Sequence, residues 1–427
     1  MIIPSVDIMS GRAVQLVQGQ KKKIDAGDPT PIAEEFGRVG DVAVIDLDAA
    51  MGTGSNAEII ESLLSRARCR VGGGIRDVET ARRWLDRGAE KIILGTAARP
   101  EILEALPRER VIAALDAKFG EVVVEGWKTG TGTSIEARMA ALKPYVGGFL
   151  ITFVEDEGTM KGFDIDRAVA LKAMAPDMNI TMAGGVRAAD EVAALDAAGL
   201  DVQVGMALYS GQFDLADALA AMLKSDRPDG LWPTVVVDEA NEALGLAYSN
   251  LESLRAALKE GRGVYHSRKR GLWRKGATSG ATQALLKVDV DCDRDALRFT
   301  VRQAGGFCHI PAQRTCFGPA DDIAGSGLYG LARRLADPHT RSQPGSYTGR
   351  LFSEDGLLEA KLREEADELA QASSAADVAH EAADVIYFTL VKLAKAGVPL
   401  EEVSRVLDAR SRKVSRRPGN AKTGASS

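Results

Sequence analysis

The stretch GGIRDVETARRWLDRGAEKIILGTAA (residues 73–98) recurs as GGVRAADEVAALDAAGLDVQVGMAL (residues 184–208). Each copy reads as a glycine turn, an amphipathic helix and a short apolar strand. The same alternation continues on both sides, so that residues 1–222 contain eight short apolar strands separated by helices. Two similar halves of four strand–helix units favour a closed (β/α)8 barrel, or TIM barrel, over an open doubly wound sheet.

The composition describes an ordinary globular protein. The chain has 427 residues, 45% hydrophobic and 27% charged, and this length predicts about three domains. No apolar run reaches the roughly 18–20 residues of a membrane-spanning helix, and MIIPSVDIMSGR lacks the features of a signal peptide. Four cysteines are too few for a disulfide framework, and a net charge of −6 argues against general nucleic-acid binding. We expect a cytoplasmic protein with no membrane or nucleic-acid partner.

The pattern changes twice after the barrel. SDRPDGL (residues 225–231) is a polar break, after which β-branched strands such as TVVVD and LRFTVRQ are joined by glycine-rich turns, as in a compact α+β domain. From residue 346 the chain is almost wholly helical. The predicted boundaries are 1–224 for the barrel, 225–318 for the α+β domain, 319–345 for a linker carrying one helix, 346–422 for an all-α domain and 423–427 for a disordered tail.

Candidate catalytic residues lie where the barrel strands end, because this fold places its chemistry on the loops after those ends. Asp7 ends the first strand and Asp116 the fifth, so two carboxylates would face each other as base and acid for a sugar isomerisation. Matching glycine turns in the two halves offer backbone N–H groups to phosphates, which suggests a substrate with two phosphates. The turn residues are Gly73, Gly74, Gly95 and Thr96 in one half, and Gly184, Gly185 and Gly205 in the other.

Segments throughout residues 1–220 resemble the histidine-biosynthesis isomerase that acts on phosphoribosylformimino-AICAR-phosphate. They include IPSVDIMSGRAVQLVQG, VIDLDAAMGTGSN, LDAKFGEVVVEGW and AGGVRAADEV. The resemblance implies that Asp7 is the general base and that Asp116 is a second essential carboxylate. It also implies that the glycine sets hold the two phosphates and that Trp127 lies over the substrate.

One segment departs from the isomerase pattern. Where that family reads Thr-Asp-x-x-Arg-Asp-Gly-Thr, this chain has TFVEDEGT (residues 152–159). The family's acid Asp becomes Glu157, which keeps a carboxylate on a longer arm, and its Arg becomes Asp156, which reverses a charge. These like charges could raise a carboxyl pKa or weaken the binding of a bis-phosphate. Gln15 and Gln20 stand where the family usually has Arg and Asp.

The α+β domain contains VDVDCDRDAL, which alternates aspartates with Cys292 and Arg294. On an extended chain, alternate residues share a face, so carboxylates suited to Mg²⁺ would project one way and a thiolate suited to zinc the other. Cys308-His309 and Cys316 follow, and three thiolates with an open fourth position could hold Zn²⁺ and activate water. The candidate magnesium ligands are Asp291, Asp293 and Asp295.

GRGVYHSRKRGLWRKGATSG, VDCDRDAL and GFCHIPAQRTCFG resemble phosphoribosyl-AMP cyclohydrolase, over about residues 226–318. The resemblance implies a zinc ion on Cys292, Cys308 and Cys316, shared across a homodimer interface, and magnesium on the aspartates. It implies hydrolytic opening of the adenine ring, with His266 and His309 as candidates for proton transfer. The residues expected to face the substrate are Ser267, Arg268, Trp273, Lys275, Thr278 and Ser279.

Carboxylates are also paired in the helical domain. KLREEADEL places Glu365 and Glu368 on one helix face, beside Glu364, and HEAADVIYFTL places Glu381 and Asp384 on another. Facing helices would gather these groups around Mg²⁺, which could bridge to a pyrophosphate. Together with SYTGRLF, these segments resemble phosphoribosyl-ATP pyrophosphohydrolase, an all-α enzyme, over about residues 346–422. The expected phosphate contacts are Arg350, Lys361, Arg410, Lys413, Arg416 and Arg417.

The three resemblances describe consecutive steps of L-histidine biosynthesis, run from the C-terminal domain towards the barrel. They imply Zn²⁺ and Mg²⁺ as cofactors and phosphoribosyl nucleotides as substrates. Three alternatives stay open. The barrel could be a non-catalytic scaffold on a bifunctional enzyme, it could accept the tryptophan-pathway aminoaldose, or the helical domain could be a general nucleotide pyrophosphatase.

Overall fold

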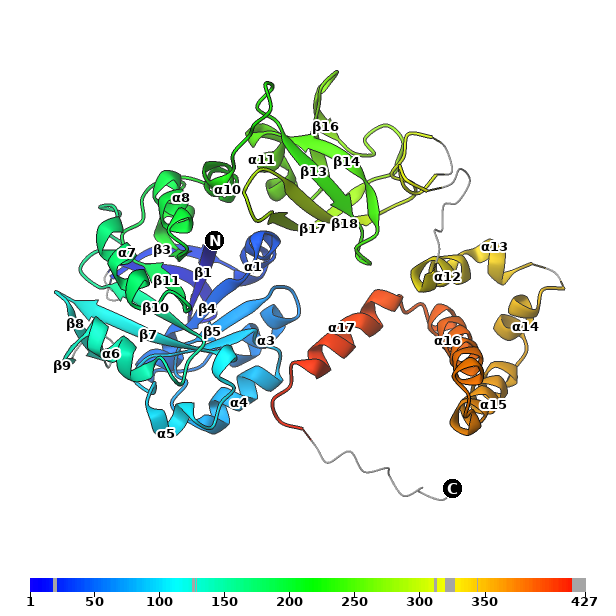
Figure 1. Ribbon diagram of the computed structural model, residues 1–427, viewed down its shortest axis with the longest axis horizontal. Coiled ribbons are helices and arrows are strands. Elements are labelled where there is room, and N and C mark those ends of the chain that lie inside the picture. The colour runs from blue at the N-terminus through cyan, green and yellow to red at the C-terminus, as the bar shows by residue number, and fades with distance from the viewer. Residues whose placement is uncertain are drawn as a thin grey trace.

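The computed structural model describes residues 1–17, 21–124, 127, 129–310, 313–318, 327–343 and 345–416. In chain order these form a barrel, a mixed α/β unit (the middle unit) and a helical unit, as the sequence predicts (Figure 1). Gln20, Arg417 and the tail predicted at 423–427 lie outside the described residues. Among the helices that are described, none has the length and apolar character needed to cross a membrane.

The barrel is a closed parallel sheet. Its last strand, β12, pairs with β1 and so joins the two edges, and β1 pairs on its other side with β4. The side chains of Ile93, Ile112 and Leu150 are buried together from three of the strands. The parallel strands of the described chain are β1 (Ile2–Met9), β4 (Val42–Asp46), β5 (Cys69–Gly72), β6 (Lys91–Leu94), β7 (Val111–Lys118), β10 (Gly148–Phe153), β11 (Asn179–Ala183) and β12 (Asp201–Val204).

Helices cover the outside of the barrel between the strands (Figure 1). Their starts are set locally: the Asp77 side chain accepts a hydrogen bond from the Thr80 N–H at α4, and Asp214 and Asp217 form a capping box at α10. The helices are α1 (Pro29–Phe36), α2 (Leu47–Met51), α3 (Ala57–Leu64), α4 (Val78–Asp86), α5 (Pro100–Leu103), α6 (Ile135–Leu142), α7 (Ile165–Met174), α8 (Ala189–Ala197), α9 (Met206–Tyr209) and α10 (Leu215–Met222), with 3-10 turns at Gly37–Val39 and Arg108–Arg110.

Two antiparallel extensions stand at equivalent places in the two halves. β2 (Arg12–Val17) turns back on β1 and continues into β3 (Lys21–Gly27). β8 (Glu121–Val124) turns back on β7 and continues into β9 (Thr129–Ser134). Both follow the carboxyl ends of strands that carry a candidate catalytic aspartate, so they wall the mouth of the barrel.

The middle unit is built on a four-stranded sheet with the order β14-β13-β18-β17. A separate hairpin, β15–β16, and one helix complete the unit, and the side chains of Tyr265 and Phe299 are fully buried in it. The elements are β13 (Trp232–Val237), β14 (Ala243–Ser249), α11 (Leu251–Glu260), β15 (Val264–Ser267), β16 (Gly271–Arg274), β17 (Gln283–Val290) and β18 (Leu297–Gln303).

The helical unit starts earlier than its predicted boundary. α12 lies within residues 319–345, the predicted linker, but Leu335 on this helix is 2% exposed and packs in one core with Leu351, Phe388 and Val391. The polar residues that follow this helix favour a linker, whereas in the structure its apolar face completes the core of the helical unit. The helices are α12 (Gly327–Ala336), α13 (Pro338–Arg341), α14 (Tyr347–Ser353), α15 (Leu357–Gln371), α16 (Ala375–Ala396) and α17 (Leu400–Ser411).

The three units touch one another. α10 of the barrel lies beside α11 of the middle unit, where Arg255 forms ion pairs with Asp214 and Asp217. After α17 the chain returns to the barrel (Figure 1), and the Asp86 carboxylate accepts hydrogen bonds from the N–H groups of Val414 and Ser415, at 2.8 and 2.9 Å. The helical unit is therefore in contact with the barrel at its C-terminal end.

Candidate functional site

Two aspartates predicted as catalytic lie at the carboxyl ends of opposite strands. Asp7 on β1 accepts hydrogen bonds from the Ser5 hydroxyl (3.1 Å) and the Gln15 amide (3.4 Å). Burial raises the pKa of Asp7 to about 6, although the Ser5 hydrogen bond opposes the shift. Burial also raises the pKa of Asp116 on β7, against hydrogen bonds from Trp127 and Thr152. Both carboxylates are therefore poised to change protonation nearer neutral pH than ordinary aspartates.

A third carboxylate, Glu157, follows β10. Its pKa rises to about 8, first because it is buried and then because of the charges of Asp7 and Asp116. An ideal Cβ placed on Gly184 would stand 3.2 Å from Glu157 Oε2, so this side chain lies against the second glycine turn. The three carboxylates thus share one site, in which one group can be protonated while another is ionised.

The paired glycine turns have a left-handed backbone and closely packed neighbours. Gly73 and Gly184 both have positive φ, 92° and 93°, and a Cβ at Gly73 would come within 2.2 Å of the Asp46 carbonyl oxygen. The first half also holds a cavity of about 200 Å³ beside Asp116. Its lining includes Gly95, Thr96, Asp116, Thr131, Thr133 and Arg138.

The sequence reasoning missed several groups at this mouth. Arg138 on α6 lines the cavity and donates to the Ala98 carbonyl at 2.7 Å, bringing a cation to the predicted phosphate site. Tyr209 donates to the Ser5 carbonyl (3.1 Å), and burial followed by the Asp7 charge raises its pKa. Thr131 and Thr133 come from β9, which pairs with β8, the strand that turns back on β7 after Asp116. The available signal was the position of this segment shortly after Asp116.

Two of the departures from the isomerase pattern, Gln15 and Asp156, lie close to the glycine turns. The buried Gln15 amide contacts both Asp7 and Gly205, where a Cβ would come within 2.5 Å of Gln15 Oε1. The Cβ of Asp156 would lie 3.1 Å from a Cβ on Gly185. An amide and a carboxylate therefore stand where the pattern calls for a cation.

In the middle unit, the structure brings two of the three candidate zinc ligands together. The Cys308 and Cys316 thiols are hydrogen-bonded, and burial followed by the Cys308 charge raises the pKa of Cys316. The His309 ring nitrogen Nδ1 lies 4.0 Å from Cys308 Sγ. The ammonium of Lys275 is buried beside both cysteines, and burial lowers its pKa, although the thiolate charges oppose the shift.

Cys292 lies at the other end of the β17–β18 hairpin. It follows β17, whereas Cys308 follows β18, which runs antiparallel to β17 for seven residues. Among the described residues, the three thiols do not form a group whose sulfur atoms lie within 4.8 Å of one another, whereas thiolates on one zinc ion stand about 2.3 Å from the metal. The described part of the chain therefore holds Cys308 and Cys316 together and Cys292 apart from them.

The aspartates come together in a way that the sequence argument did not foresee. They are not on an extended strand: β17 ends at Val290, and residues 291–296 form a turn, here called the acidic turn. Oxygens of Asp291, Asp293 and Asp295 lie within 4.8 Å of one another, and Asp291 Oδ1 accepts from the N–H groups of Asp295 and Ala296. The carboxylates meet because the chain folds back rather than because alternate residues share a face.

The predicted substrate residues of the middle unit surround the β15–β16 hairpin. Arg268 lies over the Tyr248 ring at 4.8 Å, and Trp273 packs on Tyr265 with ring centroids 5.7 Å apart. His266 Nδ1 contacts the Asn250 amide at 3.1 Å. Ser267 is half-buried at the end of β15, while Thr278 and Ser279 are exposed in the turn that leads to β17.

In the helical unit, Glu365, Glu368 and Glu381 form the glutamate cluster, with oxygens within 4.8 Å of one another. Glu365 is 6% exposed, and burial and the neighbouring glutamate charges raise the pKa of Glu368. Asp384 is exposed, and neither it nor Glu364 belongs to the cluster. Two predicted phosphate contacts hold carboxylates instead: Lys361 pairs with Glu364 and Glu365, and Arg350 pairs with Glu354.

Oxygen-only donor sets such as the acidic turn and the glutamate cluster fit Mg²⁺, and thiolates fit Zn²⁺. With this geometry in place, comparison with known proteins assigns each unit. The family model described as histidine biosynthesis protein matches residues 1–214, just over half of the chain. The chain belongs to the histidine biosynthesis protein family. Two further models match: phosphoribosyl-AMP cyclohydrolase over residues 245–318 and phosphoribosyl-ATP pyrophosphohydrolase over residues 328–411.

Individual relatives also carry histidine-biosynthesis names. A histidine biosynthesis trifunctional protein of Komagataella pastoris is 47% identical over 58% of the chain and 28% of its own length. A histidine biosynthesis bifunctional protein of Schizosaccharomyces pombe is 50% identical over 49% of each chain. A phosphoribosyl imidazole-4-carboxamide isomerase of Halobacterium salinarum is 41% identical over 52% of the chain and 96% of its own length. The chain thus spans between a quarter and a half of the multifunctional relatives and nearly all of the isomerase.

Proposed function

We propose that this chain catalyses three consecutive steps of histidine biosynthesis. The helical unit would hydrolyse phosphoribosyl-ATP to phosphoribosyl-AMP and pyrophosphate, the middle unit would open the adenine ring, and the barrel would isomerise the formimino-AICAR ribotide. The observation that carries the proposal is the barrel site, where three carboxylates with raised pKa values share one mouth. The matches of three different families to three successive units support the same sequence of reactions.

Different residues of the barrel would carry the separate proton transfers of an aldose-to-ketose rearrangement. Asp7, ionised above about pH 6, takes the proton from the sugar carbon next to the aminal carbon. Glu157, protonated below about pH 8, gives its proton to the ring oxygen as the ring opens. Trp127 and Thr152 hold Asp116 by hydrogen bonds, and Arg138 with the glycine turns would bind phosphate.

In the middle unit, Cys308 and Cys316 of one subunit and Cys292 of a second would hold Zn²⁺ in a homodimer. The place of Cys292 apart from the paired Cys308 and Cys316 supports this arrangement, because the ligands of one zinc ion must lie together. Zinc would supply activation of water for attack on the adenine ring. His309 next to Cys308 is placed to carry protons, and the acidic turn would hold Mg²⁺.

In the helical unit, the glutamate cluster would hold Mg²⁺ for the triphosphate of a bound ATP derivative. The gathering of Glu368 and Glu381 around the buried Glu365 supports this role, because neighbouring negative charges repel one another unless a cation lies between them. Lys361 already neutralises part of this charge, and Arg350 lies on α14 at the edge of the unit. A cytoplasmic location is part of the proposal, since free thiols such as those of Cys292 and Cys316 suit a reducing compartment.

Isomerase turnover tests the proposal most directly. Purified protein is given the formimino aminoaldose, and the ketose product is detected through a coupled downstream synthase. Turnover that disappears in Asp7→Asn is the expected result. Removal of metal with EDTA and a zinc chelator is expected to abolish the other two activities and leave the isomerase, because the barrel site contains no metal ligand set among its described residues.

A second candidate role for the barrel, a non-catalytic scaffold, is favoured by Gln15 and Asp156, which bring no positive charge to the phosphate turns. If Asp7→Asn leaves every measured activity intact, the scaffold is the correct reading. Turnover of the tryptophan-pathway aminoaldose would extend the barrel's substrate range. Hydrolysis of ordinary nucleoside triphosphates would instead assign the helical unit as a general pyrophosphatase.

A further inference from the structure

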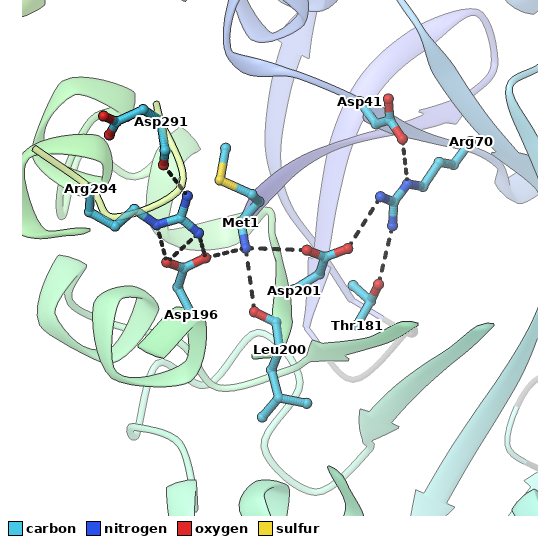
Figure 2. Close-up of polar contacts among 9 residues, drawn as sticks. All are labelled: Met1, Asp41, Arg70, Thr181, Asp196, Leu200, Asp201, Asp291 and Arg294. Carbon is cyan, nitrogen blue, oxygen red and sulfur yellow. Dashed lines mark hydrogen bonds and ion pairs between the residues drawn. The ribbon is translucent and has the colours of Figure 1, made fainter. Parts of the chain in front are cut away.

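The acidic turn of the middle unit is bound to helix α8 of the barrel. Arg294, within the turn, donates through Nε and Nη2 to the two carboxylate oxygens of Asp196 on α8, both at 2.9 Å. Figure 2 shows this two-pronged contact beside Asp291. The Asp196 side chain is 7% exposed and that of Arg294 26%. A paired guanidinium–carboxylate contact with so little water around it fixes direction as well as distance.

The backbone of the turn is held from the same side. The N–H of Lys224, just after α10, donates to the Arg294 carbonyl at 2.6 Å. Arg294 has φ +68°, a left-handed conformation that residues with a side chain rarely adopt. The barrel therefore binds both the side chain and the backbone carbonyl of Arg294. This is the residue at which the turn has its least favourable backbone conformation.

The Asp196 side chain is also held in place by contacts within the barrel. Its carboxylate also contacts the amino group of Met1 at 2.6 Å, and Asp201 lies on the other side of that amino group at 3.2 Å. Asp201 in turn pairs with Arg70, whose side chain is 10% exposed (Figure 2). These contacts hold the Asp196 carboxylate in one position, so that it accepts the Arg294 hydrogen bonds as a fixed group rather than as a mobile surface side chain.

The conformation of Arg294 decides where the aspartates of the turn lie. Its Nη1 donates to the Asp291 carbonyl at 3.2 Å, and the following N–H groups, of Asp295 and Ala296, bind Asp291 Oδ1. With this folding-back, the three candidate magnesium ligands stand within 4.8 Å of one another in spite of their mutual repulsion. Without an anchor, the turn would relax and separate them.

We propose that Asp196 of the barrel is a positioning residue for the metal site of the middle unit. It holds Arg294 in its left-handed conformation and so keeps the acidic turn ready for a divalent cation. This inference rests on the proposed cyclohydrolase function and its magnesium site. It gives the barrel a role in the second reaction that is independent of its own catalysis.

The test uses the full-length chain and Mn²⁺ as the probe. Mn²⁺ binding is followed by the electron paramagnetic resonance signal of the free ion, in a Glu365→Gln background that weakens the glutamate cluster. Asp196→Asn is expected to raise the Mn²⁺ dissociation constant of the turn about tenfold or more, as for other groups that orient metal ligands. In metal-free protein, the amides of Asp295 and Ala296 are expected to exchange hydrogen faster.

Matched variants separate positioning from general damage. Asp177→Asn changes an exposed carboxylate on the same amino-terminal face of the barrel and is expected to alter neither readout. Arg294→Gly and Arg294→Ala both remove the ion pair, but glycine adopts positive φ freely. Arg294→Gly is therefore expected to bind Mn²⁺ more tightly than Arg294→Ala, which a purely structural role for the ion pair does not require.

The possible failures are distinguishable. Unchanged Mn²⁺ affinity and amide exchange in Asp196→Asn would overturn the positioning role. If Asp293→Asn leaves Mn²⁺ binding as it is in the background protein, the proposed metal site itself is wrong, and the inference falls with it. If Asp196→Asn does not fold, Arg294→Ala, which removes the same ion pair, takes its place, and unchanged Mn²⁺ affinity and amide exchange in that variant would overturn the positioning role.

Discussion

At the scale of single residues, the carboxylates of the barrel mouth lose their protons at different pH values. The pKa of Asp7 is raised to about 6 and that of Glu157 to about 8. A base acts only when ionised and an acid only when protonated. The isomerase kcat/KM is therefore expected to rise as pH increases through about 6 and to fall as it increases through about 8. A pH–rate profile measures both limbs.

The same profile identifies the acid. Glu157→Gln is expected to slow isomerisation by roughly 10²–10⁴-fold and to remove the alkaline limb, because an amide has no proton to lose. The acidic limb, which belongs to Asp7, should remain. An alkaline limb that persists in this variant would assign the proton donor to another group, with Asp116 the next carboxylate in the site.

Asp156 offers a second test at this scale. It lies beside the Gly185 turn, where a phosphate would meet its negative charge. Asp156→Arg is expected to lower the KM for the bis-phosphate about two- to fivefold, the range of an exposed ion pair, with little change in kcat. Asp177→Arg, at the opposite end of the barrel, is the control for overall charge. An equal effect of both variants would show that Asp156 does not face a phosphate.

At the scale of elements, α12 belongs to the helical unit and its two faces differ. Leu335 is 2% exposed and Leu328 is 53% exposed on the same helix. Leu335→Ala is expected to cost about 2–5 kcal/mol in the unfolding of the helical unit, through lost burial and the cavity left behind. Leu328→Ala should change it little. The free energy of unfolding of the two variants is compared by chemical unfolding followed by far-ultraviolet circular dichroism. Equal small effects would mean that α12 is part of a linker.

Whether an element can be predicted from the sequence depends on whether local residues alone determine its conformation. The barrel strands can be predicted from the sequence because each is a short apolar run. The internal repeat, with four strand–helix units in each half, predicts that there are eight. The acidic turn could not be derived in this way, since its conformation depends on Arg294 and on a barrel residue, Asp196, almost 100 residues away. The spacing of the cysteines predicts one set of three, whereas the pairing of Cys308 with Cys316 and the separate place of Cys292 depend on how the chain folds.

At the scale of the whole molecule, the middle unit is contacted from both sides. Asp196 of the barrel reaches its acidic turn, and Arg333 of α12 reaches Asp238 and Glu242 at 3.3 and 3.1 Å. Arg314, which lies between the two paired cysteines in sequence, binds the same two carboxylates. The barrel therefore contacts the acidic turn, and the helical unit contacts carboxylates that also bind Arg314, so both neighbours support the middle unit.

The zinc arrangement makes a prediction that only an assembled molecule can meet. Cys292→Ser and Cys308→Ser are each expected to abolish ring opening, because each breaks every site of a homodimer. When the two variants are unfolded, mixed and refolded together, half of the dimers are mixed, and each contains one site with a complete ligand set. About a quarter of the wild-type cyclohydrolase activity should return. The control mixture of Cys308→Ser with Cys316→Ser should stay inactive, because both variants break the same half of the site. Recovery in the control, or none in the first mixture, would mean that the ligands are not shared between subunits.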